Sequence, residues 1–303
     1  MPALLKNPHL LLAVTALLWG GNAIAGKLAV GHISPMMLTM FRWGIALAIM
    51  VVVAWPHLKK DWPVIRENWL YLFLMGAFGY TAFNFCLYSA LQYISAINVT
   101  LEQSAMPIII FLLNFVLYRT RVRFLQIVGY LITVVGVVVT VSAGDPMSLL
   151  ASGGRSVSIG DLFMLSAALF YGGYSVALRA KPKMHWQSFL TALIAAAFPA
   201  AIVGAAMEAY AGASQFPVTL QGLLVALYAG IFPSLLSQGF FIRGVEMLGA
   251  NAAGLYINLV PIFGALLAVA ILGEQLFFFH AVAFVLVVGG ITLAQRAAKA
   301  PSA

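Results

Sequence analysis

The sequence has few charged residues and a single cysteine. Asp, Glu, Lys and Arg make up only 8% of its 303 residues, whereas soluble domains carry about 25%. Water cannot solvate a folded surface with so little charge, but a hydrocarbon environment requires such a surface. Together with 63% apolar residues, this scarcity excludes an ordinary soluble protein and predicts an all-α membrane protein.

Several functional classes need residues that this sequence does not offer. The single Cys86 cannot form an intramolecular disulfide, and the five histidines show no metal-ligand spacing. No G-x-x-x-x-G-K-[ST] segment is present to bind ATP phosphates, so we expect any driving energy to come from gradients. No residues form a recognisable nucleophile and base, so we expect neither an enzyme nor a cofactor. The net charge of +8 comes from residues in short loops, so we expect no nucleic-acid partner.

Long apolar runs fill most of the chain. About 20 apolar residues cross a bilayer as a helix, because they span roughly 30 Å at 1.5 Å per residue. The first run resembles a cleavable signal peptide, with Lys6 before it, but it is long enough to span and we expect it to remain as the first helix. The sequence predicts ten transmembrane helices, at residues 9–30, 36–55, 69–91, 95–118, 124–143, 159–178, 187–210, 219–242, 250–272 and 278–296.

The positive charges indicate how these helices are oriented. When the loops are assigned to alternate sides of the membrane, thirteen of the sixteen Lys and Arg residues fall on the side of the N-terminus. Only Lys27, Arg42 and Arg155 fall elsewhere. Because cytoplasmic loops carry an excess of Lys and Arg, the pattern predicts that the N- and C-termini are both cytoplasmic.

The two halves of the chain resemble each other. Residues 16–27, ALLWGGNAIAGK, resemble residues 168–179, ALFYGGYSVALR, at a register of 152 residues. Residues 91–107 correspond to residues 245–261 at a register of 154. Each half, 1–150 and 151–303, then holds five of the predicted helices. An odd number of helices inserts the second half upside down, so the predicted fold is two inverted five-helix repeats, as in many secondary transporters.

Short motifs carry a family resemblance. The opening LLWGGNAIAGK, the prolines in Met106-Pro107 and Val260-Pro261, and Leu272-Gly273-Glu274 before the last helix together resemble the EamA family of the drug/metabolite transporter superfamily. The likeness covers about residues 10 to 296. It implies export across a bacterial inner membrane, with the aromatic amino-acid exporters of the YddG type as the nearest match. The first half departs from the pattern at residues 118–121, where Gly-Glu would be expected, which questions strict functional symmetry.

Two ionisable residues lie well inside predicted helices. Glu102 and Arg42 are each about 10 Å below the outer membrane surface at 1.5 Å per residue. A charge at this depth costs a few kcal/mol at least, so such residues are functional candidates. The depths predict an intramembrane ion pair between Arg42 and Glu102, with Lys27 as a competing partner. The pair could be structural, or it could handle substrate or protons.

Polar and aromatic residues near the middle of the membrane are the candidates for a substrate cavity. Those near Pro107, Pro233 and Pro261 are favoured, because a proline frees a backbone carbonyl, and aromatic rings could stack against a substrate. Trp43, by contrast, is assigned to the interfacial aromatic belt. We expect about half of the polar residues to serve only in helix packing. The predicted substrate-binding residues are Trp19, Asn22, Tyr80, Asn84, Glu102, Gln103, Ser104, Tyr171, Tyr174, Ser237, Gln238, Tyr256 and Asn258.

Small residues and prolines that match between the halves are candidate hinges. Paired glycines in the first and sixth helices would let these helices flex or approach a neighbour, and a proline in the fourth and ninth helices interrupts each of them. Close helix packing would also explain the glycines. The predicted hinge residues are Gly20, Gly21, Pro107, Gly172, Gly173 and Pro261.

These features favour a secondary transporter that exports small metabolites, most of all aromatic or neutral amino acids, by alternating access around a central cavity. A phosphate would require several arginines in the cavity, and only Arg42 is available. The alternatives are export of other small metabolites or cationic drugs, a channel and an intramembrane enzyme. The expected partners are a small-molecule substrate and membrane lipid, and the expected state is a monomer.

Overall fold

The computed structural model describes residues 7–120, 122–149, 157–249, 253 and 256–299. Within these residues all regular structure is helical, and nine helices are long and apolar enough to cross a membrane. A shorter apolar helical segment occupies Ile257–Leu272. The protein is therefore a multi-pass α-helical membrane protein, as predicted. Residues 250–252 and 254–255 of the predicted ninth helix lie outside the described residues.

Several of the membrane-crossing segments are interrupted, and each part has its own label. The third segment runs from α3 through the π-helical turn η2 into α4, and the eighth runs from α10 through the π-helical turn η5 into α11. The elements up to α7 are α1 (Pro8–Ala29), α2 (Pro35–Glu67), α3 (Trp69–Gly76), η2 (Ala77–Ala82), α4 (Phe83–Ala90), α5 (Ala96–Gln103), α6 (Met106–Tyr118) and α7 (Phe124–Val141). The later elements are η3 (Pro146–Leu149), α8 (Ile159–Ala177), η4 (Leu178–Ala180), α9 (Trp186–Tyr210), α10 (Leu220–Ile231), η5 (Phe232–Leu236), α11 (Ser237–Leu248), η6 (Ile257–Leu259), α13 (Val260–Leu267), η7 (Ala268–Leu272) and α14 (Phe278–Lys299).

Most predicted boundaries agree with the helices to within two residues, but three helices extend farther, and the smallest extension is that of α14, which ends at Lys299 instead of residue 296. α2 continues to Glu67, twelve residues past the predicted end at residue 55, and α11 continues to Leu248. The polar residues after Trp55, such as Lys59 and Lys60, end the apolar run without ending the helix. The helix also passes through Pro56 and Pro63. Hydropathy detects the part of a helix that lipid surrounds, and a helix that continues into water keeps its backbone hydrogen bonds.

Polar side chains fix the starts of helices near the cavity. The Asn7 side chain accepts hydrogen bonds from the backbone N–H groups of His9 and Leu10, at 3.0 and 3.2 Å. The carboxylate of Glu274 accepts from the N–H groups of Ala96 and Ile97, at 2.7 and 3.0 Å. These N–H groups have no partner inside their own helix. Glu274, from the motif before the last helix, therefore caps α5 across a long sequence separation.

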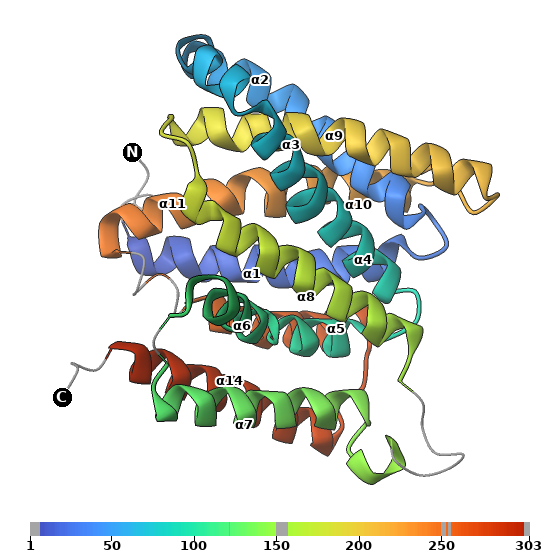
Figure 1. Ribbon diagram of the computed structural model, residues 1–303. Coiled ribbons are helices and arrows are strands. Elements are labelled where there is room, and N and C mark those ends of the chain that lie inside the picture. The colour runs from blue at the N-terminus through green and yellow to red at the C-terminus, as the bar shows by residue number, and fades with distance from the viewer. Residues whose placement is uncertain (1–6, 121, 150–156, 250–252, 254–255, 300–303) are drawn as a thin grey trace.

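Figure 1 shows the helices as a layered bundle. α2 and α9 pack along one edge, and α7 and α14 lie side by side along the opposite edge. Between them, α1 packs against α11 and α13, while α8 packs against α4 and α6. α1 begins and α14 ends on the same side of the bundle.

Glycines allow the closest helix contacts. A Cβ atom on Gly129 of α7 would lie 2.5 Å from the carbonyl oxygen of Gly290 on α14, which is too close for any side chain. A Cβ atom on Gly20 of α1 would lie 2.8 Å from the backbone nitrogen of Gly264 on α13. Small residues let membrane helices approach until their backbones touch. The first contact brings α7 against α14, and the second brings α1 against α13 beside the cavity.

Candidate functional site

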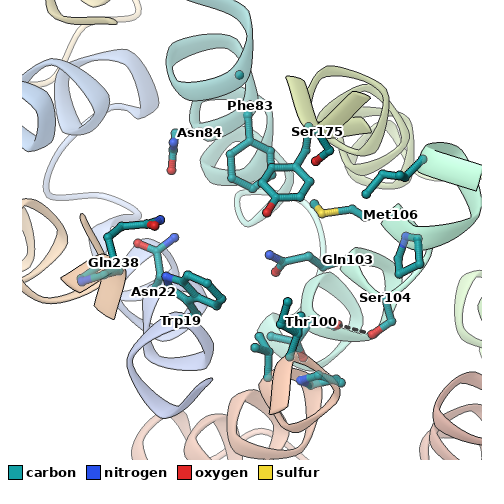
Figure 2. A pocket seen from close by; sticks show the side chains of 18 of the residues that line it. Trp19, Asn22, Phe83, Asn84, Thr100, Gln103, Ser104, Met106, Ser175 and Gln238 are labelled. Carbon is teal, nitrogen blue, oxygen red and sulfur yellow. Dashed lines mark hydrogen bonds between the residues drawn. The ribbon is translucent and has the colours of Figure 1, made fainter. Parts of the chain in front are cut away.

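A cavity of about 250 Å³ lies between the inner helices (Figure 2). Helices from both halves of the chain line it, including α1, α2, α4, α8, α11 and α13. A concave, largely apolar space with a few polar groups is the usual form of a small-molecule site.

The backbone is irregular at four places on the cavity wall. α5 ends at Gln103, and a turn at Ser104 and Ala105 separates it from α6, which carries Pro107. The 3₁₀ turn η6 precedes α13 in the same way, and α13 carries Pro261. The π-helical turns η2 and η5 also line the cavity, through Tyr80 and Ser234. Interrupted helices are tolerated at membrane depth where they line a cavity, and they supply polar backbone to it.

Arg42 is the one charged residue among the described residues that line the cavity, and it is only 6% exposed. Its Nε donates to Ser234 Oγ at 2.8 Å. Its Nη1 donates to Asn22 Oδ1 at 3.0 Å, to Asn84 Oδ1 at 2.7 Å and to the Tyr88 hydroxyl at 2.7 Å. Four helical segments, α1, α2, α4 and η5, therefore meet at one guanidinium.

The partners of Arg42 are themselves held in place. The Tyr88 hydroxyl donates to Asn22 Oδ1 at 2.9 Å, and Asn84 Nδ2 donates to the Tyr80 carbonyl at 2.7 Å. Ser234 Oγ donates to the Ala229 carbonyl at 2.7 Å. Each acceptor oxygen is thereby oriented toward the guanidinium. The network is electrically neutral except for Arg42.

Aromatic rings form another part of the wall. The Trp43 and Tyr80 rings are stacked, with centroids 4.8 Å apart and planes 18° from parallel. Phe83 and Tyr171 lie 5.3 Å apart. The assignment of Trp43 to the interfacial belt is wrong, because this residue is buried against α9 and reaches the cavity. Sequence position near a helix end does not reveal which way a tryptophan points.

Nine of the thirteen predicted substrate-binding residues line the cavity. Figure 2 shows the side chains of Gln103 and Gln238 directed toward the space between them. Neither makes a hydrogen bond with another residue that the structure describes, so both amides can bind a ligand. The nine residues are Trp19, Asn22, Tyr80, Asn84, Gln103, Ser104, Tyr171, Gln238 and Asn258.

The other four predicted residues are not part of the cavity wall. Ser237 is fully buried and donates to the Pro233 carbonyl at 2.6 Å. Tyr174 lies against Tyr80, with ring centroids 5.6 Å apart. The Tyr256 hydroxyl contacts His9 Nδ1. These three support neighbouring residues, and Glu102 is the fourth.

The predicted ion pair of Glu102 with Arg42, or with Lys27 in its place, is wrong in this structure, where no ion pair of Glu102 occurs among the described residues. Arg42 is bound by neutral groups, and Glu102 lies beside the carboxyl of Asp161 on α8. Lys27 Nζ donates to the carbonyls of Leu91 and Ile94, at 2.8 and 2.9 Å. Arg42 and Glu102 were predicted to pair because they lie at the same depth in the membrane, but their side chains lie on helix faces that meet different neighbours.

Several cavity residues were not predicted from the sequence. Thr100 and Ser175 lie three residues before Gln103 and four residues after Tyr171, so helical periodicity alone could have indicated them. The apolar residues gave no such signal, because apolar residues are everywhere in this chain. They include Phe83, Met106, Ile110, Ile257, Val260, Val288 and Ile291.

The candidate hinge residues occupy different environments. Pro107 and Pro261 lie on the cavity wall at the interrupted helices. Gly20 and Gly172 sit at tight helix contacts, and a Cβ atom on Gly21 would collide with the Tyr228 hydroxyl. Gly173 has open space around the position of a Cβ atom. Packing thus accounts for three of the glycines but not for Gly173.

Comparison with known sequences gives the family. The sequence model of the EamA-like transporter family matches twice, at residues 7–142 and 158–295. The chain belongs to this family. It is 23% identical over 299 residues to the uncharacterized transporter YyaM of Bacillus subtilis, covering 97% of this chain and 95% of that protein. It is 26% identical over 291 residues to an uncharacterized transporter of Archaeoglobus fulgidus, covering 95% and 97%.

A solved structure has the same fold as this EamA-like transporter. The structure, described as "Crystal structure of protein", has a TM-score of 0.65 and 22% sequence identity, and the match covers 97% of this chain and 99% of that one. At this identity the likeness concerns the fold alone. Family and fold together establish a membrane transporter.

Proposed function

We propose that this protein is a secondary transporter that exports small metabolites, above all aromatic or neutral amino acids, by alternating access around the cavity. The observation that carries the proposal is a central cavity where helices from both family-matched stretches are interrupted. Transporter sites are typically built from such discontinuous helices.

Matched positions on the cavity wall support two inverted repeats, residues 1–150 and 151–303, with ten transmembrane helices. At the register of 154, Asn84 corresponds to Gln238, Ser104 to Asn258 and Pro107 to Pro261, and all six line the cavity. The helix packing is matched too. α1 packs against α11 and α13, and its counterpart in the other half, α8, packs against the corresponding helices α4 and α6. Two related halves around one site can exchange between two states of access.

The proposed location is the bacterial inner membrane, with both termini in the cytoplasm. The thirteen positive charges on one side support this orientation. Because α1 begins and α14 ends on the same side (Figure 1), the helix arrangement agrees with it. Reporter fusions at Met1 and Ala303 test the orientation directly, and an extracytoplasmic C-terminus would contradict it. The protein is proposed to act as a monomer, without a cofactor, nucleic acid or enzymatic activity.

The composition of the cavity favours a zwitterion with a variable side chain. One guanidinium and several neutral amides suit a small charged group, and the aromatic wall suits an apolar or aromatic part. A phosphate would require more than one arginine. A cationic drug would be opposed by Arg42, since no acidic residue lines the described wall.

Purified protein in proteoliposomes tests the function. Labelled phenylalanine, leucine and alanine inside the vesicles should leave faster than from empty liposomes, and unlabelled substrate outside should accelerate the exchange. The change Ser104→Phe fills the cavity and should abolish transport. Ser166→Phe makes the same change outside the cavity wall, beside the Leu162 carbonyl, and should retain most of it. Equal rates for these two variants would contradict transport through this cavity.

The rate separates a transporter from a channel. Typical catalysed turnover does not exceed about 10³ per second, and a channel would pass far more molecules. A rate above that range, without acceleration by substrate on the opposite side, would favour the channel.

A further inference from the structure

Arg42 has no counter-charge inside the protein. All eight acidic residues lie in the described part of the chain, and none of their carboxylates is within 4.0 Å of the Arg42 guanidinium. The only ion pair at that distance among the described residues joins Arg243 to Glu246 at the surface. A buried cation is normally paired, because taking a charge out of water is costly. Its neutral partners offset only part of that cost.

The Arg42 guanidinium also has N–H groups that make no hydrogen bond with the described residues. Arginine presents five N–H donors and remains charged at any physiological pH. The four hydrogen bonds in the structure use Nε and Nη1. Nη2 donates to none of the described residues, and Arg42 lines the cavity.

Amide donors surround the same part of the cavity. Asn22 Oδ1 accepts from both Arg42 and Tyr88, which leaves the Nδ2 group of Asn22 as a donor. Gln238 lines the cavity from α11, which packs against the α1 helix that carries Asn22 (Figure 2), and the Gln238 amide has no hydrogen bond to the described residues. Donors therefore converge here on a space that holds no acceptor of opposite charge.

We propose that Arg42 binds the carboxylate of the transported molecule, with Asn22 and Gln238 as additional donors. This inference rests on the proposed function, and it makes a carboxylate the required group of the substrate. The apolar part of the molecule then lies toward the rings of Tyr80, Phe83 and Tyr171. An amino group is not the anchor, because no acid lines the described wall.

Carboxylate binding is tested by thermal shift of the purified protein, a measurement that does not depend on transport. The ligands are compared in series whose members differ at the carboxylate. Each of phenylalanine, leucine and tryptophan is compared with its amide, its decarboxylated amine and its deaminated acid. A bound ligand raises the melting temperature. Compounds that retain the carboxylate should bind about ten- to a hundredfold more tightly than those that lack it, as expected for hydrogen bonds to a charged group. Equal binding by the amides or amines would overturn the proposal.

Substitutions at Arg42 test the residue itself. Arg42→Gln should abolish the preference for the carboxylate. Arg42→Lys keeps the charge but loses the planar fork, so it should retain a weakened preference. A preference that persists in Arg42→Gln would assign the carboxylate to another residue and overturn the proposal.

A third test applies even if the Arg42 variants fold poorly or no compound binds. It introduces a carboxylate into the protein itself, beside Arg42. Asn22→Asp places a carboxylate where Oδ1 already accepts from Nη1 at 3.0 Å. It should raise the melting temperature without ligand and remove carboxylate-dependent shifts. Asn258→Asp makes the same change on the cavity wall without contacting Arg42, and it should not raise the melting temperature. An Asn22→Asp variant no more stable than the wild type would overturn the proposal.

The two proposals fail in different ways. Carboxylate binding without movement across vesicles would leave the Arg42 site in place and remove the transport function. Efflux that is equally fast for amines and carboxylates, and unaffected by Arg42→Gln, would leave the transport function and remove the carboxylate site.

Discussion

The two stretches matched by the family model contribute differently to the cavity. Both supply aromatic, amide and proline side chains at corresponding positions, such as Trp19 and Tyr171 at the register of 152. Among the described residues of the cavity wall, only the first stretch supplies a charge. At registers of 152 to 154, Arg42 corresponds to residues 194–196, Ile-Ala-Ala, and Ile194 is fully buried in the apolar cluster between α2 and α9. The shared positions form the cavity, and the unshared charge determines what it can bind.

The largest expected effect comes from moving the charge to the second stretch. Ile194→Arg would bury a guanidinium among Trp43, Ala46 and Leu190 without a partner. An unpaired buried charge costs about 3 to 5 kcal/mol, so this variant should not fold stably. Ile194→Met keeps the volume and should cost less than about 1.5 kcal/mol. Thermal unfolding in detergent measures both, and a stable, active Ile194→Arg variant would show that the two positions are interchangeable.

The second-largest difference in stability is expected between alanine substitutions at the corresponding glycines Gly20 and Gly172. Gly20→Ala would push a methyl group against the backbone of Gly264, which cannot move aside, and overpacking of this kind costs about 1 to 3 kcal/mol. At the corresponding Gly172, the methyl group would meet the Ile109 side chain, which can rotate, so the cost should be smaller. A larger loss of melting temperature for Gly172→Ala would contradict this explanation.

At Gly173 a role in helix packing can be distinguished from a role as a hinge. No atom lies within 4 Å of the position of its Cβ, and alanine favours a helix over glycine by about 0.8 to 1.0 kcal/mol. Gly173→Ala should therefore be at least as stable as the wild type. If Gly173 is a hinge, transport should nevertheless fall. Unchanged efflux would remove it from the predicted hinges.

The first stretch lacks the Leu-Gly-Glu motif that the second stretch carries at residues 272–274. Disrupting this motif should have a moderate effect on stability. Glu274→Ala removes the carboxylate that caps α5 and should cost about 0.5 to 2 kcal/mol. Thr120 occupies the corresponding position in the first stretch at the register of 154. No hydrogen bond of the Thr120 side chain is present among the described residues, so Thr120→Ala should stay within about 0.5 kcal/mol. Equal losses in thermal unfolding would mean that the motif is symmetric after all.

A small effect on stability is expected at Glu102. Its Oε1 is buried without a hydrogen-bond partner among the described residues, and Asp161 is its carboxyl neighbour. Because no cation partner would be left behind, Glu102→Gln should change the free energy of unfolding by less than about 1 kcal/mol. Efflux is the second measurement. Lost transport in a stable Glu102→Gln variant would indicate a role with protons or substrate, and a strongly destabilised variant would contradict the absence of a cation partner.

The sequence by itself determined that lipid surrounds the protein, that it is a multi-pass helical protein and where most of its helices lie. Lipid requires long apolar helices and forbids charge on their surface, so composition alone predicted a multi-pass helical protein. The sequence also indicated nine of the cavity residues, because polar side chains such as Gln103 and Asn258 are conspicuous at membrane depth. Short motifs at a fixed register, such as Met106-Pro107 and Val260-Pro261, were sufficient to predict the family.

Only the tertiary structure decided which of these residues meet. Arg42 and Ser234 are 192 residues apart in sequence and 2.8 Å apart in space, whereas Glu102, at the depth of Arg42, is turned toward α8. Trp43 looked interfacial and is buried. Depth in a membrane follows from counting residues along a helix, at 1.5 Å each. The rotation of each helix depends on close packing against its neighbours, and this rotation selects the partners of every buried side chain.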